Sequence, residues 1–166
     1  MESLIGAADL DGHAAHWVGS RTPQGRSARV LVVDDDAAMR ALYSLTLRTA
    51  GHDVLEAEDG QRGLELARSE DPDLALLDVR MPRLDGFQLA EALRGDRRTR
   101  AIPVVFVSAE ADSASYARAR ALGAAGYLTK PFDPHTLESL VAHVAADRSS
   151  QGADLQPVGA PRSART

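Results

Sequence analysis

The chain has no cysteine, and this absence removes several kinds of chemistry. Without thiols, none of the 166 residues can form a disulfide, a thiolate zinc site or a cysteine nucleophile. The N-terminal stretch, residues 1–27, also lacks the long apolar run and basic start of a secretory signal or a membrane span. We therefore expect a cytoplasmic protein with no membrane partner.

An excess of basic residues is missing as well. The sequence has 19 lysines and arginines against 24 acidic residues, and its formal net charge is −5. Proteins that bind nucleic acids neutralise phosphates with clustered basic side chains. The run Arg97-Arg98-Thr99-Arg100 is short and is typical of a solvated loop, so we expect no nucleic-acid partner.

Lysine is almost absent, and its single occurrence is informative. Of the 19 basic residues only Lys130 is a lysine. An ammonium is a compact charge on a flexible stem, whereas a guanidinium is a broad planar fork. A site that needs one slim cation beside a carboxylate or a phosphate would therefore use lysine at this position.

The length is that of one domain with tails. We expect residues 1–28 to be a flexible N-terminal extension and residues 29–147 to form the domain. Residues 148–166 are rich in small and polar residues and are expected to be a disordered tail.

Between the tails, short apolar runs alternate with helical patterns, which is typical of βα units around a parallel sheet. The pattern predicts a doubly wound five-stranded α/β fold. The expected strands are 29–33, 53–57, 74–77, 104–107 and 126–128. The expected helices are 37–49, 60–70, 86–93, 113–122 and one that begins at Pro134 behind the N-cap Asp133.

Hydrophobic patterning also predicts where some of these elements lie. The first, third and fourth strands contain continuous apolar runs and should be central, whereas 53–57 alternates and should lie at an edge or be half exposed. In the helix 37–49 we expect Met39, Leu42, Leu45 and Leu47 to lie largely on one side.

Acidic residues follow two of the central strands. The first strand ends in Asp34-Asp35-Asp36, and the third ends in Asp78. Asp36 is expected to cap the following helix, but capping does not require the other acids. Because the carboxyl ends of parallel strands meet at one edge of the sheet, the remaining carboxylates should lie close together and favour a bound hard cation, Mg²⁺.

A hydroxyl and an ammonium are predicted at the same edge. Ser108 ends the fourth strand, and the fifth leads into Lys130. An acidic Mg²⁺ pocket flanked by one hydroxyl and one ammonium is suited to hold a phosphoryl group.

These residues resemble the receiver domain of two-component response regulators, in particular a stand-alone, chemotaxis-regulator-like receiver. The resemblance covers about residues 29–147 and implies a flavodoxin-like fold with strand order 2-1-3-4-5. It rests on four motifs in the family's order: Val32-Val33-Asp34-Asp35; Leu77-Asp78-Val79-Arg80-Met81-Pro82 with Asp85-Gly86; Val107-Ser108-Ala109; and Lys130-Pro131-Phe132.

The resemblance implies a role for each site residue. Asp78 would be the phosphoacceptor, and Asp34, Asp35 and the backbone carbonyl of Arg80 would hold Mg²⁺ with it. Ser108 and Lys130 would contact the phosphoryl group, and Lys130-Pro131 would be a cis peptide. The side chains of Arg80 and Glu110 would flank the pocket and influence the rate of dephosphorylation.

The resemblance also implies partners. A histidine kinase or histidine phosphotransfer protein would donate the phosphoryl group, and the chain would catalyse only its own phosphorylation and dephosphorylation. Movement of Ser108 would let Tyr127 turn inward and change which downstream protein binds. A phosphorylation-sensitive homodimer is one form that this output could take. The kinase, the downstream protein and the pathway are not encoded in any motif.

Two other functions stay open at this point. One is a receiver-fold module that binds proteins without being phosphorylated. The other is a haloacid-dehalogenase-type phosphatase, because Asp34-Asp35-Asp36 contains an Asp-x-Asp spacing. That family places Thr or Val where this chain has Ala38, and the chain has no room for a cap domain.

Overall fold

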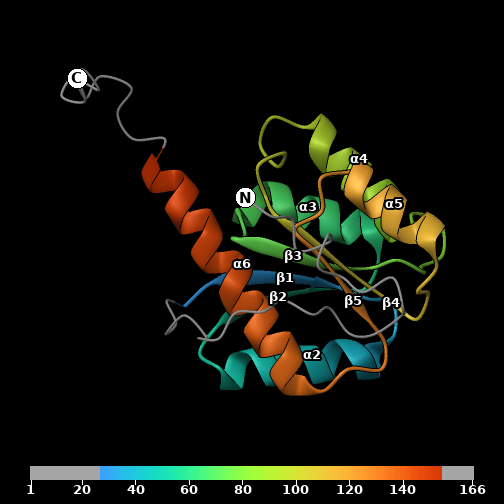
Figure 1. Ribbon diagram of the computed structural model, residues 1–166, viewed down its shortest axis with the longest axis horizontal. Helices are drawn as coiled ribbons and strands as arrows, with labels where there is room; N and C mark the ends of the chain where they lie inside the picture. The colour runs from blue at the N-terminus through green and yellow to red at the C-terminus, as the bar shows by residue number, and fades with distance from the viewer. Residues whose placement is uncertain (1–26, 155–166) are drawn as a thin grey trace.

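The computed structural model describes residues 27–154, with side chains up to Arg148 (Figure 1). Most of the predicted N-terminal extension and the end of the predicted C-terminal tail lie outside the described residues. The strands are β1 (Arg29–Val33), β2 (Asp53–Ala57), β3 (Leu74–Asp78), β4 (Val104–Ser108) and β5 (Gly126–Thr129). The helices are α2 (Ala37–Thr49), α3 (Gly60–Glu70), α4 (Gly86–Gly95), α5 (Ser113–Ala121) and α6 (Pro134–Asp154).

The strands form one parallel sheet in the order β2-β1-β3-β4-β5, as predicted. Each of β1, β3 and β4 has strands on both sides, and β3 and β4 are buried along their whole length. β2 lies at an edge and has exposed and half-buried residues, which explains its alternating sequence. The direction of the chain connections switches between β1 and β3, and the two acidic motifs follow these strands.

Helices cover both faces of the sheet (Figure 1). On one face, α3, α4 and α5 pack through Leu64, Phe87 and Tyr116 into a core that includes Leu31 and Phe106 of the sheet. On the other face, α2 and α6 pack against the strand side chains that point away from the first core. The helices contribute Tyr43, Leu47, Leu137, Leu140, Val141 and Val144 to this second core.

Aspartates cap the N-termini of helices that start at the sheet edge where the acidic motifs lie. Asp36 Oδ1 accepts hydrogen bonds from the backbone N–H groups of Ala38 and Met39, which confirms its predicted N-cap role. Asp85 forms a capping box with Gln88 at the start of α4. Asp133 Oδ1 accepts a hydrogen bond from the backbone of Thr136, in agreement with the predicted cap of α6.

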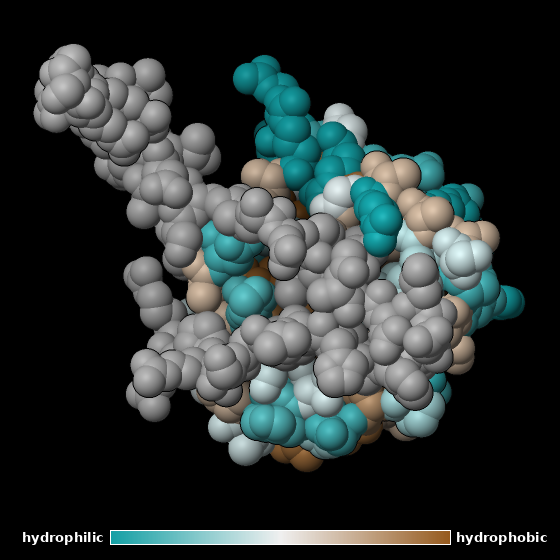
Figure 2. Space-filling model, viewed as in Figure 1, coloured by the Kyte–Doolittle hydropathy of each residue, from teal (hydrophilic) through white to brown (hydrophobic). Residues whose placement is uncertain are grey.

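The predicted buried side of α2 is wrong in part. Leu47 is buried, but Leu42 and Leu45 are 47% and 66% exposed, and Tyr43 is buried instead. Tyr43 and Leu47 are one helical turn apart and face the sheet, so Leu42 and Leu45 fall on the outer flank. Figure 2 shows hydrophobic surface at the lower edge of the molecule, where α2 lies in this view.

The helix α6 continues past Asp147, the predicted last residue of the domain. Arg148 Nη1 donates hydrogen bonds to the backbone carbonyls of Pro72 and Asp73. At the other end of the domain Ala28 is buried, and its backbone N–H donates to His52 Nδ1. Within residues 27–154, no helix is long and apolar enough to cross a membrane.

Candidate functional site

Three carboxylates meet where β1 and β3 end. Oxygens of Asp34, Asp35 and Asp78 lie within 4.8 Å of one another. Asp34 and Asp78 are buried, whereas Asp35 is exposed. Asp34 and Asp35 follow the last residue of β1, and Asp78 is the last residue of β3. Because β1 and β3 are paired in parallel, these residues lie at the same edge of the sheet, as the sequence predicted.

The buried carboxylate of Asp34 is only partly satisfied. Its Oδ1 accepts a hydrogen bond from the backbone N–H of Asp36, and its backbone carbonyl accepts one from Arg40 Nη1. Its Oδ2 is buried and has no hydrogen-bond partner within the described part of the chain. A buried carboxylate oxygen without a partner is costly, so a ligand that binds this oxygen would stabilise the site.

Burial is the main influence on the titration of these acids. The pKa of Asp78 is raised from 3.8 to about 6, chiefly by burial and then by the neighbouring charge of Asp34, whereas Lys130 opposes the rise. The pKa of Asp34 is also raised, chiefly by burial. The two acids are therefore held close together at a free-energy cost that a cation would relieve.

Lys130 brings a positive charge to this cluster. Its Nζ lies 3.3 Å from Asp78 Oδ1 and 3.7 Å from Asp34 Oδ2. The backbone N–H of Lys130 donates to the carbonyl of Ser108, which extends the β4–β5 pairing up to the site. The Lys130-Pro131 peptide bond is cis, as predicted. The only lysine of the chain thus lies between two buried carboxylates.

The donor set fits Mg²⁺. It consists of carboxylate oxygens with no imidazole or thiolate among them, and hard oxygen ligands are those that Mg²⁺ prefers. Oδ2 of Asp34 accepts no hydrogen bond from the described residues and has the Lys130 ammonium at 3.7 Å, so it leaves a buried acceptor for the ion or for one of its waters. Asp34, Asp35 and Asp78 would hold the ion, and the resemblance adds the carbonyl of Arg80.

Ser108 and Tyr127 are linked through the backbone of Glu110. Ser108 Oγ accepts a hydrogen bond of 3.0 Å from the backbone N–H of Glu110. The hydroxyl of Tyr127 donates to the carbonyl of Glu110 at 2.7 Å. The Tyr127 ring is fully buried against Tyr116, at 4.6 Å between centroids, so it already points inward in this structure.

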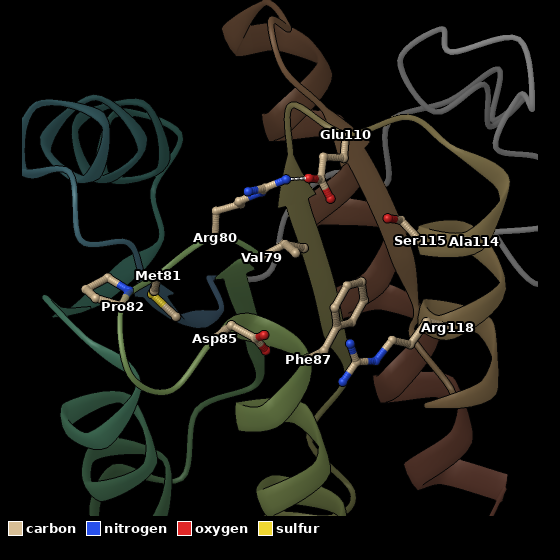
Figure 3. Close-up of a pocket in the computed structure, with 10 residues that line it drawn as sticks. All are labelled: Val79, Arg80, Met81, Pro82, Asp85, Phe87, Glu110, Ala114, Ser115 and Arg118. Atoms are coloured by element: carbon tan, nitrogen blue, oxygen red, sulfur yellow. Dashed lines mark hydrogen bonds and ion pairs between the residues drawn. The ribbon is translucent and has the colours of Figure 1, made fainter.

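Arg80 and Glu110, which the resemblance implied would flank the pocket, pair with each other. Arg80 Nη2 and Glu110 Oε1 form an ion pair between the loop after β3 and the loop after β4 (Figure 3). The pair crosses one end of a pocket of about 620 Å³. At the other end the guanidinium of Arg118 lies 4.6 Å from the centre of the Phe87 ring.

Sequence reasoning predicted no packing role for three residues that shape the site, although Gly86 and Phe132 stand in the quoted motifs. A Cβ atom on Gly86 would lie 2.3 Å from the carbonyl oxygen of Asp78, so only glycine allows α4 to approach the acceptor strand this closely. Tyr43 of α2 stacks on Phe132 of the lysine motif at 5.6 Å between centroids. Burial and the nearby carboxylates raise the pKa of Tyr43, which therefore stays neutral beside the acids. No local pattern marks these contacts, because each joins segments far apart in sequence.

Comparison with known proteins agrees with this geometry. Residues 30–142 match the family model of the response regulator receiver domain. Protein PilH of Pseudomonas aeruginosa is 43% identical over 121 residues, which cover 72% of this chain and 98% of PilH. The "DNA-binding dual master transcriptional regulator RpaA" of Synechocystis is 42% identical over 118 residues, covering 71% of this chain. The chain spans about half of that relative, 48% of its length.

Solved structures of other receiver proteins share this fold. The chemotaxis protein CheY4 of Vibrio cholerae superposes with a TM-score of 0.69 at 34% identity, and the match covers 72% of this chain and 99% of CheY4. The matched residues 30–142 include the four acidic, hydroxyl and lysine motifs. The chain belongs to the response regulator receiver domain family of two-component signalling.

Proposed function

We propose that this chain accepts a phosphoryl group on Asp78 from a phosphohistidine of a histidine kinase or phosphotransfer protein. The observation that carries the proposal is the buried Asp78 carboxylate between Lys130 and the carboxylates of Asp34 and Asp35. This surrounding gives the nucleophile a cation on one side and a metal-binding set on the other. Receiver membership alone would not require that these groups be in place.

The chemistry follows from the positions of the side chains. One carboxylate oxygen of Asp78 attacks the phosphorus, the bond from phosphorus to the imidazole nitrogen breaks, and the electron pair of that bond leaves with the imidazole. A pKa of about 6 leaves Asp78 mainly ionised, and so nucleophilic, at pH 7. Bound Mg²⁺ would supply charge neutralisation at the phosphoryl oxygens. Lys130, now 3.3 Å from Asp78, would pair with a phosphoryl oxygen, and Ser108 would hydrogen-bond another.

The same pocket limits how long the phosphoryl group lasts. Hydrolysis of an acyl phosphate needs a water aligned opposite the Asp78 oxygen. The Arg80–Glu110 ion pair joins the loop that follows Asp78 to the loop that follows Ser108. We propose that the pair restricts water and so influences the rate of dephosphorylation.

The output is proposed to be a change in protein contacts. Tyr127 and Ser108 lie on neighbouring strands and share Glu110, so a shift at the phosphoryl group reaches the surface made by α5, β5 and α6. A downstream protein or a second copy of the chain would bind there. We propose that residues 29–147 are the receiver and that it works in the cytoplasm, a reducing location that suits a chain without cysteine.

The direct test is the intact mass of the protein after incubation with Mg²⁺ and acetyl phosphate. We expect one phosphate on the wild-type chain and none on Asp78→Asn. Asp53→Asn is a matched control, because it removes an exposed acid at the opposite end of the sheet. Acetyl phosphate avoids the need for the unidentified kinase.

One observation favours a second function, binding of a protein without phosphorylation. Tyr127 is already buried and bonded to Glu110, so the inward conformation does not wait for a phosphoryl group. Beryllium fluoride binds a receiver site as a stable substitute for the phosphoryl group. If the wild-type protein shows no phosphate adduct and also binds no beryllium fluoride, rapid hydrolysis does not explain the missing adduct, and this second function replaces the first.

A further inference from the structure

Glu110 makes three contacts that join otherwise separate parts of the site. Its backbone N–H donates to Ser108 Oγ, and its backbone carbonyl accepts from the Tyr127 hydroxyl. Its carboxylate pairs with Arg80, two residues after Asp78. One residue therefore touches the hydroxyl at the end of β4, the buried ring on β5 and the loop that carries the phosphoacceptor.

Among the described residues, the connection that carries Glu110 is also held by Ala111, which packs against the core, and by Asp112, which caps α5. Ser108 is the last residue of β4 and α5 begins at Ser113, so Glu110 lies in the connection between them. Apart from the contacts to Ser108 and Tyr127, the ion pair ties this connection to the loop after β3. Figure 3 shows the two side chains reaching toward each other from opposite sides of the pocket mouth. The position of the Glu110 carbonyl, to which Tyr127 donates, thus depends on Arg80.

We infer that the Arg80–Glu110 ion pair is a latch that holds Tyr127 in its inward position and links that position to the acceptor loop. Arg80 and Glu110 are positioning residues in this role. The inference deepens the proposed function, on which its meaning for signalling rests. A change in the loop around Asp78 then reaches Tyr127 through Arg80 as well as through Ser108.

Charge on the acceptor affects this latch. Arg80 is two residues from Asp78, and its side chain is 77% exposed, so it is free to turn toward added negative charge. A phosphoryl group on Asp78 would compete with the Glu110 carboxylate for the guanidinium. The latch therefore responds to the same event as Ser108 by a second route, and in the opposite direction, because loss of the ion pair would free Tyr127 from its inward position.

The test measures how often Tyr127 leaves its buried position in the unphosphorylated protein. With isotope-labelled tyrosine, NMR gives the rate at which the hydroxyl proton of each of the three tyrosines exchanges with solvent. The Tyr127→Phe variant assigns the signal. We expect Arg80→Gln and Glu110→Gln each to raise the Tyr127 exchange rate about two- to fivefold, the range typical of one exposed ion pair. The swap of Arg80→Glu with Glu110→Arg should restore the wild-type rate.

The control is Arg83→Gln. Arg83 lies on the same loop, its side chain is 80% exposed, and it pairs with Asp59 instead. The hydroxyl of Tyr116, which is buried against Thr129, reports in every variant whether the fold is intact. Tyr127 exchange in Arg80→Gln and Glu110→Gln no faster than in Arg83→Gln overturns the latch. The exchange assay needs no phosphate, so it tests the latch independently of phosphorylation. Failure of Asp78 to take up phosphate would overturn the proposed function but would not change the measured exchange rates of Tyr127.

Discussion

At the scale of single residues, the site is organised around a carboxylate that is costly to bury. Burial and Asp34 hold the pKa of Asp78 at about 6, against an ordinary value of 3.8. This difference of about two units corresponds to about 3 kcal/mol of unfavourable free energy at neutral pH. The acid is thus retained at the expense of stability, as functional groups often are.

We therefore expect Asp78→Asn to stabilise the metal-free protein by about 1–3 kcal/mol at pH 7. The sign follows from the raised pKa: the folded state binds a proton more tightly than the unfolded state. The gain should be complete above about pH 6, should shrink as the pH falls toward 3.8, and should disappear below 3.8, where the wild-type acid is protonated in both states. Urea unfolding with a chelator at several pH values measures it, and a gain that grows toward acid pH would contradict it.

Lys130 allows a second prediction at this scale. Its ammonium fits between Asp78 and Asp34, at 3.3 and 3.7 Å. In Lys130→Arg the charge is kept, but the wider guanidinium should displace the phosphoryl group or the acids. We expect phosphorylation by acetyl phosphate to slow about ten- to a hundredfold, since a misplacement of about 1 Å has this effect. Mass spectrometry over time measures the rate. Normal phosphorylation and normal Tyr127 exchange in this variant would show that the site does not require the compact ammonium of lysine.

At the scale of elements, the start of α4 determines where the acceptor strand ends. Gly86 donates its backbone N–H to the carbonyl of Val79, and a Cβ at this position would collide with the Asp78 carbonyl. The strand, its loop and the helix must therefore be packed together for Asp78 to be in place. Two elements, rather than one motif, position the nucleophile.

We expect Gly86→Ala to destabilise the fold by about 1–3 kcal/mol, as overpacking of a close contact does, and to reduce phosphorylation of Asp78. Gly95→Ala is the matched control, because it lies in the same helix and its added Cβ would meet nothing within 4 Å. Thermal unfolding and intact mass measure both effects. Equal stability and phosphorylation in the two variants would show that the backbone of Asp78 moves freely.

At the scale of the whole molecule, Mg²⁺ bound at the acidic edge would stabilise the whole fold, because the three carboxylates come together only when the sheet is formed. A ligand that binds only the folded state raises its stability by an amount set by ligand concentration and affinity. We expect saturating Mg²⁺ to stabilise the wild-type protein by about 1–3 kcal/mol. Asp35→Asn, which removes an exposed acid of the cluster, should reduce the effect.

Calorimetric or fluorescence unfolding curves with Mg²⁺ and with sodium chloride of equal ionic strength test this. Equal stabilisation by the two salts would mean that general screening, and no bound ion, relieves the repulsion among the carboxylates.

Much of the fold follows from local sequence. The predicted boundaries of β1, β2, α2 and α3 agree with the structure, because caps and apolar patterns act over a few residues. The convergence of Asp34, Asp78 and Lys130 could be predicted as well. It requires only that the strands be parallel, since their carboxyl ends then share one edge.

Some features of the elements could not be predicted. Leu42 and Leu45 match the apolar spacing of a buried helix side, yet both are exposed, because the sheet and α6 decide which flank of α2 faces inward. Arg148 reads as part of a polar tail, but the carbonyls of Pro72 and Asp73 accept its hydrogen bonds.

The amino-acid sequence alone therefore determined the order of the elements and the acids, hydroxyl and ammonium brought to one edge of the sheet. Only the tertiary structure decided the inward position of Tyr127, the pairing of Arg80 with Glu110 and the need for glycine at Gly86. The reason is physical: propensities and periodicity act between neighbours in the chain, whereas these contacts form between loops that meet only after the sheet has been assembled.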